Sequence, residues 1–316
     1  MINVSSSSVK YLFSVFILIL FILSGCKTTD VGSARQDQAP FLSQDLNSLI
    51  SPDGKIVESR PIKIQYEWAE SIECYKIKYL SDGLKVVGFV VKPKMDGLKY
   101  PLIILNRGGN REFGKLTEKS LKYLTYLSSQ KYVVLASQYR GNDGGQGKEE
   151  FGGKDVNDVL NLIKMAKSLP FINSSKIVML GYSRGGMMTY LAIKNGAEIE
   201  AAAVVGGITD LGQMYSERGN DMKKVIRDLV GMDKTEWEKR SVYYWPEKID
   251  VPILILHGED DSRVKVSQAK KLSEKLKQAG VVHELVIFSN GDHSLYTHRA
   301  ERNQKILDWF ERYVNR

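Results

Sequence analysis

A serine stands at the centre of a glycine-rich turn that has the pattern of a hydrolytic nucleophile. The segment Gly181-Tyr182-Ser183-Arg184-Gly185 has the spacing G-x-S-x-G, directly after the apolar run Ile177–Leu180 and directly before the start of an apolar helix. Glycines two residues before and after the serine allow the backbone to pack closely around a tight turn that exposes the hydroxyl. The helix that begins there directs its amide dipoles at developing negative charge. The pattern therefore predicts nucleophilic catalysis at Ser183.

A serine hydroxyl needs a base to take its proton, and the base needs an acid to orient it. His293 follows the apolar run Leu285–Phe288 and is the candidate base. Two carboxylates, Asp260 and Asp261, follow the run Ile253–Leu256 and are the candidate acids. Site residues of open parallel sheets gather beyond the carboxyl ends of the strands. The chain order Ser, Asp, His after successive strands therefore predicts a catalytic triad.

Short apolar runs alternate with helical patterns over most of the chain. The runs have the length of buried strands and fall at Leu102–Leu105, Tyr132–Ala136, Ile177–Leu180, Ala201–Val205, Ile253–Leu256 and Leu285–Phe288. Residues 156–163, 269–279 and 306–314 place their apolar residues on one helical face. The alternation predicts an α/β fold with a mostly parallel sheet covered on both sides. Alternating residues around Ser81-Asp82-Gly83 predict an antiparallel hairpin at one edge of the sheet.

One long segment, Thr209–Lys248, interrupts this alternation between two predicted strands. Its charged and aromatic composition predicts a helical, lid-like insertion over the carboxyl edge of the sheet. Its aromatic residues are expected to pack the insertion onto the core rather than line a substrate pocket; they are Trp237, Tyr243, Tyr244 and Trp245. Its acidic residues are expected on a solvated helix face rather than around a substrate amino terminus; they are Glu217, Asp221 and Glu247.

From about residue 100 onward the chain resembles the catalytic domain of the prolyl oligopeptidase family, within the α/β-hydrolase fold. Besides the elbow at 181–186, the resemblance rests on Tyr139-Arg140-Gly141, Gly144-Gly145, Gly153–Val156, His257–Val264 and Asp292-His293. It implies Ser183 as nucleophile and His293 as general base and then general acid. The family pattern His-Gly-x-x-Asp-x-x-Val falls on His257, Gly258, Asp261 and Val264. The resemblance therefore implies Asp261, rather than Asp260, as the orienting acid.

The chain departs from that family in two features. The family's oxyanion loop usually has a tyrosine or histidine before two small residues, whereas here Arg107 precedes Gly108 and Gly109. The backbone amides of Arg184 and of the Gly108-Gly109 turn are the expected oxyanion donors, and Arg107 either adds charge or faces solvent. The stretch before the core strands is far shorter than the propeller domain of large members, so we expect no selection of peptides by a propeller.

The N-terminus has the pattern of an export signal. Lys10 precedes the apolar stretch Tyr11–Leu23, which is shorter than the roughly 20 residues of a spanning helix and typical of a signal peptide. Leu23-Ser24-Gly25-Cys26 resembles the lipobox of bacterial lipoproteins, in which the cysteine carries the lipid. We expect a signal peptide at 1–25, a flexible tether at 26–48 and the catalytic domain at 49–316. Lipid on Cys26 would hold the protein on a cell envelope membrane; the alternative is a plain secretory peptide or short anchor.

Composition excludes several other classes of protein. A chain of 316 residues with 43% hydrophobic and 26% charged residues is typical of one large globular domain, not of a disordered or multi-spanning membrane protein. The net charge of +8 comes from basic residues scattered among acidic ones, which indicates a basic surface rather than a nucleic-acid site. With Cys26 acylated, Cys74 has no disulfide partner and is expected to be a packing residue.

The sequence shows no metal or nucleotide signature, so we expect no cofactor. The glycine-rich stretch 141–147 lacks the Gly-Lys-Ser/Thr ending of a phosphate loop and is interpreted as a flexible loop at the rim of the site. The predicted activity is acyl-enzyme hydrolysis of a peptide or related acyl substrate. A carboxylesterase acting on small or glycan-linked esters needs the same triad and is the alternative. A non-catalytic binding module would be indicated by a broken triad, and all three members are present.

Overall fold

The computed structural model describes residues 53–65, 67–94 and 97–315. The predicted signal peptide, the tether and the lipid attachment site Cys26 lie outside these residues. Among the helices of the described residues, none has both the length and the apolar character needed to cross a membrane.

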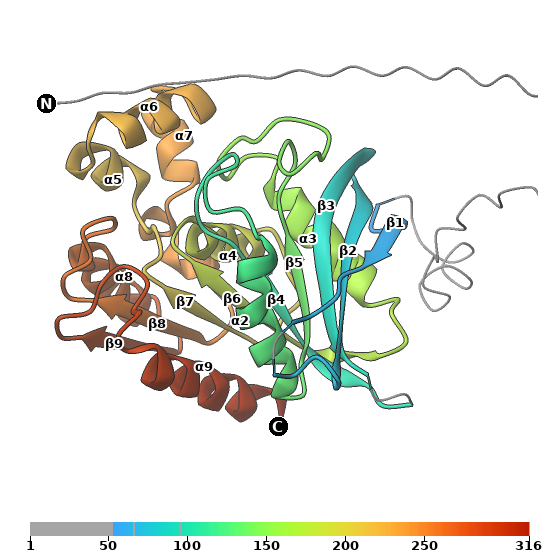
Figure 1. Ribbon diagram of the computed structural model, residues 1–316. Helices are drawn as coiled ribbons and strands as arrows, with labels where there is room; N and C mark the ends of the chain where they lie inside the picture. The colour runs from blue at the N-terminus through green and yellow to red at the C-terminus, as the bar shows by residue number, and fades with distance from the viewer. Residues whose placement is uncertain (1–52, 66, 95–96, 316) are drawn as a thin grey trace, which may run out of the picture. The chain divides into compact units, whose positions relative to one another are not determined.

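The described chain folds around a nine-stranded sheet with the spatial order β1-β2-β3-β5-β4-β6-β7-β8-β9 (Figure 1). The strands are β1 (Ile56–Pro61), β2 (Ile72–Ser81), β3 (Leu84–Pro93), β4 (Tyr100–Asn106), β5 (Val133–Ser137), β6 (Ile172–Tyr182), β7 (Ala201–Val205), β8 (Ile253–Gly258) and β9 (His283–Phe288). The pairings β1-β2, β2-β3 and β3-β5 are antiparallel, and every pairing from β5 to β9 is parallel. This confirms the predicted α/β fold with an N-terminal antiparallel hairpin.

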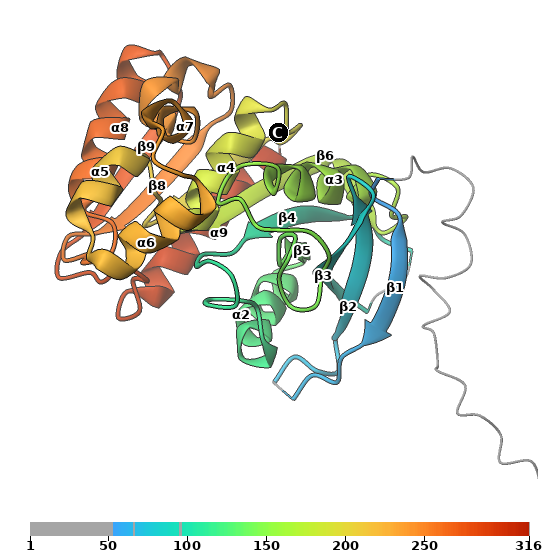
Figure 2. The same ribbon diagram turned by 90° about the horizontal axis from the view of Figure 1, so that it is seen from above.

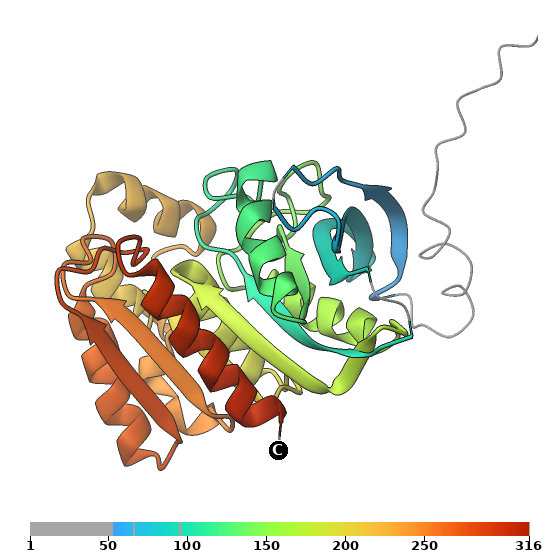
Figure 3. The same cartoon turned by 60° about the horizontal axis from the view of Figure 1, so that its bottom comes forward.

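Helices cover both faces of the sheet, and the strands bury side chains on both (Figures 2 and 3). One face carries α2 (Glu118–Ser129) and α9 (Arg299–Val314), and the other carries α3 (Val156–Ala166), α4 (Arg184–Lys194) and α8 (Val266–Gln278). In β4, Leu102 and Ile104 pack into the core beneath α3 and α4, whereas Ile103 and Leu105 pack into the core beneath α2 and α9. Successive side chains point to opposite faces of a strand, so a strand buried on both faces has an uninterrupted apolar sequence.

The segment between β7 and β8 folds into short helices that lie together at one end of the molecule (Figure 1). They are α5 (Leu211–Glu217), α6 (Asn220–Leu229), α7 (Lys234–Lys239) and the 3-10 segments Val242–Tyr244 and Pro246–Lys248. Asp210 and Asp233 begin two of them, because their carboxylates accept the amides of Gln213 and Thr235. The indole N–H groups of the buried Trp237 and Trp245 donate to backbone carbonyls within the insertion. These tryptophans pack the insertion onto the core, as expected, whereas Tyr244 is 50% exposed and does not.

Candidate active site

Ser183 occupies a sharp turn between the carboxyl end of β6 and the start of α4. Its φ of 54° lies in the left-handed region, which a non-glycine residue adopts only when the surrounding structure enforces it. The flanking glycines allow this turn, because a methyl group on Gly181 would lie 2.4 Å from the carbonyl oxygen of Gly185. On Gly185 it would lie 1.9 Å from the carbonyl oxygen of Asn106. The turn presents the side chain of Ser183 to a pocket, with the N-terminus of α4 directly beneath it.

His293 and Asp261 form a hydrogen-bonded pair in the loops after β9 and β8. The Nδ1 atom of His293 lies 2.7 Å from Oδ2 of Asp261, and Asp261 is 1% exposed. The other oxygen, Oδ1, accepts the backbone amides of Arg263 and Val264. Burial alone would raise the pKa of Asp261, but hydrogen bonds from His257 and His293 outweigh it and hold the pKa well below its usual range. The carboxylate is therefore ionised and fixes the orientation of the imidazole. Asp260 is exposed.

A second histidine contacts the same carboxylate. His257 is fully buried at the end of β8, and its Nε2 lies 2.8 Å from the carbonyl oxygen of Val264 and 3.2 Å from Oδ2 of Asp261. With its proton on Nε2, His257 donates to both acceptors. The sequence assigns His257 no role of its own, although the pattern His-Gly-x-x-Asp-x-x-Val contains both His257 and Val264. The spacing of four residues between His257 and Asp261 in this pattern could have indicated their contact.

The predicted oxyanion loop lies against the nucleophile. A methyl group on Gly108 would lie 3.2 Å from Cβ of Ser183, a tight contact, so the absence of a side chain lets this loop lie close to the elbow. Gly109 has a φ of 76°, and a methyl group there would lie 2.1 Å from the carbonyl oxygen of Phe113. Gly108, Gly109 and Arg184 all line the pocket of Ser183. Within the part of the chain that the structure describes, the amides of Gly109 and Arg184 donate to no protein acceptor.

The side chain of Arg107 does not face solvent, so that alternative from the sequence is wrong. It is 2% exposed and donates to the carbonyl oxygens of Gln138, Gly108 and Arg111. Burial, followed by the charge of Arg184, lowers the pKa of Arg107 to about 10, which leaves the guanidinium charged at neutral pH. The guanidinium thereby ties the oxyanion loop, through Gly108 and Arg111, to the neighbouring segment at Gln138. Arg107 fastens the oxyanion loop in the place where the family usually has an aromatic residue.

Arg184, the residue after the nucleophile, is the centre of a buried ion-pair network. Its guanidinium is 1% exposed, contacts Oε1 of Glu149 at 2.9 Å and donates to Oδ2 of Asp155. It also lies over the rings of Tyr139 and Phe151, at 4.6 and 4.8 Å from their centroids. Burial would raise the pKa of Glu149, but the charge of Arg184 and hydrogen bonds to the carboxylate lower it. The stretches around residues 139 and 155 that carried the family resemblance therefore support the elbow from below.

The pocket at the elbow has a volume of about 430 Å³. It holds both Ser183 and His293, and its apolar lining includes Phe151, Ile208 and Met214. The insertion contributes Met214, Arg218 and Met222 to this lining, whereas none of its four aromatic residues singled out above does so. The acidic residues Glu217, Asp221 and Glu247 are exposed and lie outside the lining, as expected for a solvated face.

Cys74 is buried in β2, and burial raises the pKa of its thiol to about 12. A thiol with such a pKa stays protonated at neutral pH and is not a nucleophile. Cys74 is a packing residue, as the sequence indicated. Within the described chain, no group of His, Cys, Asp and Glu residues has the arrangement of a metal site.

A serine on a strained elbow, in one pocket with a histidine held by a buried carboxylate, defines the chain as a serine hydrolase of the α/β-hydrolase fold. A sequence profile of the prolyl oligopeptidase family matches residues 119–316. The chain is also 33% identical over 215 residues to the uncharacterized peptidase YtmA of Bacillus subtilis, spanning 66% of this chain and 82% of that protein. The chain belongs to the prolyl oligopeptidase family, as the sequence resemblance indicated.

Of three other similar proteins, two are much longer than this chain. The uncharacterized peptidase YuxL of Bacillus subtilis is 27% identical over 298 residues, which are 86% of this chain but 43% of YuxL. The Pyrococcus horikoshii acylaminoacyl peptidase has a TM-score of 0.68 at 23% identity and covers 77% of this chain, which spans 42% of that structure. Acetyl xylan esterase 1 from a Thermoanaerobacterium species has a TM-score of 0.60 at 15% identity, covering 83% and 89% of the two chains. At these identities the structures show a common fold.

Proposed function

We propose that this protein is an exported, lipid-anchored serine peptidase that cleaves peptide or related acyl bonds through an acyl-enzyme. The observation that carries the proposal is the 2.7 Å hydrogen bond between His293 and the buried carboxylate of Asp261, in loops beside the strained Ser183. The names of the similar proteins support the peptidase class: the B. subtilis protein is called a peptidase, and so is the P. horikoshii structure.

In the proposed mechanism, Nδ1–H of His293 donates a hydrogen bond to the Asp261 carboxylate, so that Nε2 is the basic nitrogen. His293 takes the hydroxyl proton as Oγ of Ser183 bonds to the acyl carbon. The carbonyl oxygen becomes an oxyanion, which the amides of Arg184 and of the Gly108-Gly109 turn stabilise. The bond to the leaving amine then breaks, and that amine takes the proton from His293. Water, activated by the same histidine, hydrolyses the acyl-Ser183 ester and restores the serine.

The proposed mechanism draws on the ionised state of Asp261. Each time His293 takes a proton it becomes an imidazolium, and the nearby carboxylate stabilises that charge. Because Asp261 is 1% exposed, water screens this attraction little. Hydrogen bonds from the Arg263 and Val264 amides hold the carboxylate in place. Through the contact between Oδ2 of Asp261 and Nδ1 of His293, the loop after β8 therefore both orients the imidazole and stabilises its positive charge.

The test of this mechanism uses the full chain in detergent and a fluorophosphonate probe that reacts with activated serines. We expect the wild type to be labelled, and Ser183→Ala and His293→Ala to remain unlabelled while folded. Ser174→Ala changes an exposed serine on the same strand and is the matched control, with labelling expected as in the wild type. A folded wild type that is not labelled would favour the non-catalytic binding module instead.

A carboxylesterase is the second candidate, because ester hydrolysis needs the same nucleophile, base and oxyanion donors. The similarity to an acetyl xylan esterase, which extends over most of both chains, supports keeping this candidate. The two activities differ in the leaving group, since an amine must be protonated as it departs and an alkoxide leaves more readily. Rates on p-nitrophenyl esters and on aminoacyl p-nitroanilides separate them. Anilide turnover supports the peptidase, and turnover of esters alone supports the esterase.

Membrane attachment is proposed from the lipobox-like Leu23-Ser24-Gly25-Cys26. Several acyl chains on one cysteine give firm anchoring, because each buried methylene contributes about 0.8 kcal/mol. Residues 26–48 would then join the lipid to the catalytic domain. Mass spectrometry of the N-terminal peptide is expected to show a diacylglycerol on Cys26, and Cys26→Ala is expected to move the protein from the membrane fraction. An unmodified Cys26 in the membrane fraction would contradict the lipoprotein proposal.

A further inference from the structure

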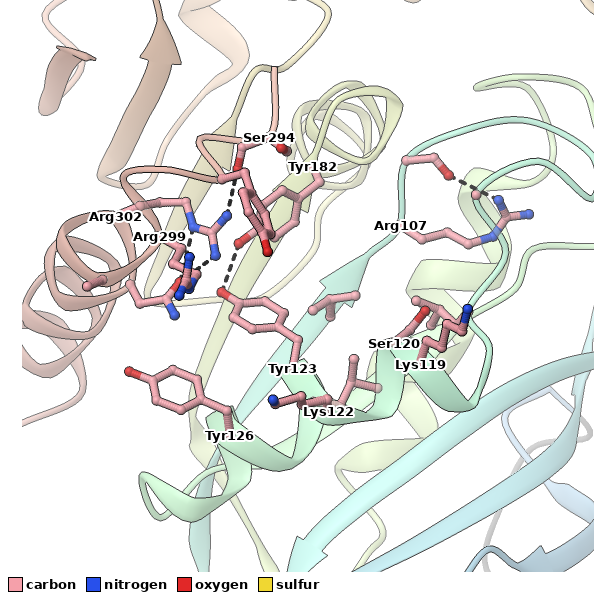
Figure 4. A pocket seen from close by; sticks show the side chains of 18 of the residues that line it. Arg107, Lys119, Ser120, Lys122, Tyr123, Tyr126, Tyr182, Ser294, Arg299 and Arg302 are labelled. Atoms are coloured by element: carbon pink, nitrogen blue, oxygen red, sulfur yellow. Dashed lines mark hydrogen bonds between the residues drawn. The ribbon is translucent and has the colours of Figure 1, made fainter. Parts of the chain in front are cut away.

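A second and larger cavity adjoins the catalytic pocket. Its volume is about 890 Å³, and Gly108, Gly114, Tyr182 and Ser294 line both spaces. Figure 4 shows the larger cavity, with Tyr182 and Ser294 labelled. Its walls come mainly from α2, from the start of α9 and from the oxyanion loop. The proposed mechanism assigns this cavity no role, although Tyr182 and Ser294, which adjoin Ser183 and His293 in the chain, line it. A substrate that extends beyond the reacting bond would enter it.

The lining of this cavity combines aromatic rings with positive charge. The rings are those of Trp68, Tyr123, Tyr126, Tyr182 and Tyr296. The basic side chains, apart from Arg107 which fastens the loop, are those of Lys119, Lys122, Arg299 and Arg302 (Figure 4). Within the described chain, no aspartate or glutamate lines the cavity. Such a surface fits a ligand that has an apolar or aromatic body and a negative charge.

Arg302 is the most buried of these cations, being 9% exposed. Its Nη1 donates to the carbonyl oxygen of Ser294 at 2.6 Å, and its Nε and Nη2 donate to Oδ1 of Asn303. Its guanidinium lies 5.5 Å from the ring centroids of both Tyr123 and Tyr182. Every one of these partners is neutral, and burial raises the pKa of both tyrosines, so neither ring supplies a phenolate. A buried cation that has only neutral partners favours an anion nearby.

The position of the cavity indicates which part of the substrate it receives. It meets the catalytic centre at Ser294, the residue after His293. His293 must protonate the leaving group in the proposed mechanism, so that group departs on the side of the histidine. The apolar wall formed by Phe151, Ile208 and Met214 lies in the other pocket and suits the acyl side. With the acyl group in the apolar pocket, which also contains His293, the larger cavity is the space that remains for the leaving group.

We propose that this cavity binds the leaving group of a peptide substrate and selects one that ends in a free carboxylate. The leaving amine would be a C-terminal amino acid or short C-terminal peptide, with its carboxylate near the basic side chains and its side chain against the tyrosines. In the reaction, the acyl carbon bonds to Ser183, its bond to nitrogen breaks, and the amine takes the proton from His293. This inference rests on the proposed peptidase function.

The test compares peptides of one sequence that end either in a free carboxylate or in a carboxamide, with cleavage followed by mass spectrometry. For the wild type we expect kcat/KM to be about tenfold higher for the peptide that ends in a free carboxylate. Two or three partly exposed charge pairs between that carboxylate and the basic side chains would give a difference of this size. In Lys119→Gln/Arg299→Gln this acid-to-amide ratio is expected to fall to about two. Lys277→Gln, an exposed charge change on α8, is the control with an unchanged ratio. Arg302 is kept, because its bond to Ser294 supports the loop of His293.

The ratio separates binding from a structural effect, because a variant with a disturbed fold loses rate on both peptides equally. Cleavage of acid and amide at equal rates would overturn the inference and leave the peptidase function standing. An unchanged ratio in the double variant would also overturn it. A third set of peptides with an N-terminal succinyl group places the carboxylate on the acyl side; a preference for that set alone would assign the cavity to the acyl group. Absence of both labelling and cleavage would overturn the proposed function, and this inference with it.

Discussion

Replacing Arg184 by methionine is expected to destabilise the fold strongly while leaving the backbone amide at position 184 in place. The side chain is 1% exposed and neutralises Glu149 and Asp155, whose side chains are 4% and 0% exposed. Removing one partner of a buried ion pair costs about 3–5 kcal/mol of the free energy of unfolding, because the other charges stay buried without compensation. That is a large part of the roughly 5–15 kcal/mol that stabilises a typical protein.

The effect of Arg184→Met should depend on pH in a defined direction. In the wild type, the pKa of Glu149 is lowered despite burial, so this group contributes stability above the pKa of the unfolded chain, and the contribution is lost as the pH falls through the folded pKa. Without Arg184, burial disfavours the charged form, and the carboxylate can protonate in mild acid. We therefore expect the difference in stability between variant and wild type to be largest at about pH 7–8 and to shrink towards about pH 4–5.

Urea unfolding followed by tryptophan fluorescence measures this difference at each pH. Arg227→Met, an exposed arginine on α6, is the matched control and should change the free energy of unfolding by less than about 0.5 kcal/mol. The double variant Arg184→Met/Glu149→Gln should lose less than the sum of the two single variants, because the two side chains interact. A loss below about 1 kcal/mol for Arg184→Met at pH 7, or a loss that grows in acid, would refute the reasoning from buried charge.

Three further outcomes follow from the site. Asp261→Asn should lower kcat by about 10⁴-fold with little change in fold. In the wild type, the acid limb of kcat/KM should contain no ionisation of Asp261, because the pKa of this carboxylate is held well below its usual range. Two ionisations in that limb would contradict this. His257→Gln removes the second imidazole from Asp261 and should reduce kcat/KM to roughly a tenth, and an unchanged value would show that this contact is only structural. Gly185→Ala places a methyl group 1.9 Å from the carbonyl oxygen of Asn106 and should yield little folded protein; a stable, labelled variant would refute the tight contact.

Much of the fold could be predicted from the sequence because buried strands have a local signature. The predicted run Ala201–Val205 is β7 with the same bounds, and the run Leu285–Phe288 lies within β9 (His283–Phe288). β6 begins at Ile172, five residues before its predicted apolar run, since the intervening residues 173–176 are polar and at least partly exposed. β1 (Ile56–Pro61) was not predicted, because this edge strand is mostly exposed and its sequence has no apolar pattern.

The ion-pair network could not be predicted, because its members are far apart in the sequence. Arg184 and Asp155 are 29 residues apart, and no periodic pattern links a charge in a loop to a charge in a helix. Because charged residues are usually on the surface, the sequence could not decide whether Arg107 faces solvent or adds charge to the site. The stretches around residues 139 and 155, which carry the family resemblance, contain members of the network, but their sequence does not show which residues they contact. Only the folded chain brings these charges under the elbow.

The same network joins the two halves of the proposed oxyanion site. Arg184 supplies a backbone amide at the start of α4, and its guanidinium donates to the carbonyl oxygen of Gly109 at 3.3 Å. Arg107 donates to the carbonyl oxygen of Gly108, and Glu149 accepts the amide of Arg111 in the same loop. Carbonyl groups held by buried guanidinium groups fix the peptide planes that follow them, and with those planes the direction of the next amides. In this chain, charged side chains therefore provide the rigidity of the oxyanion loop, which explains how an arginine can stand where the family usually has an aromatic ring.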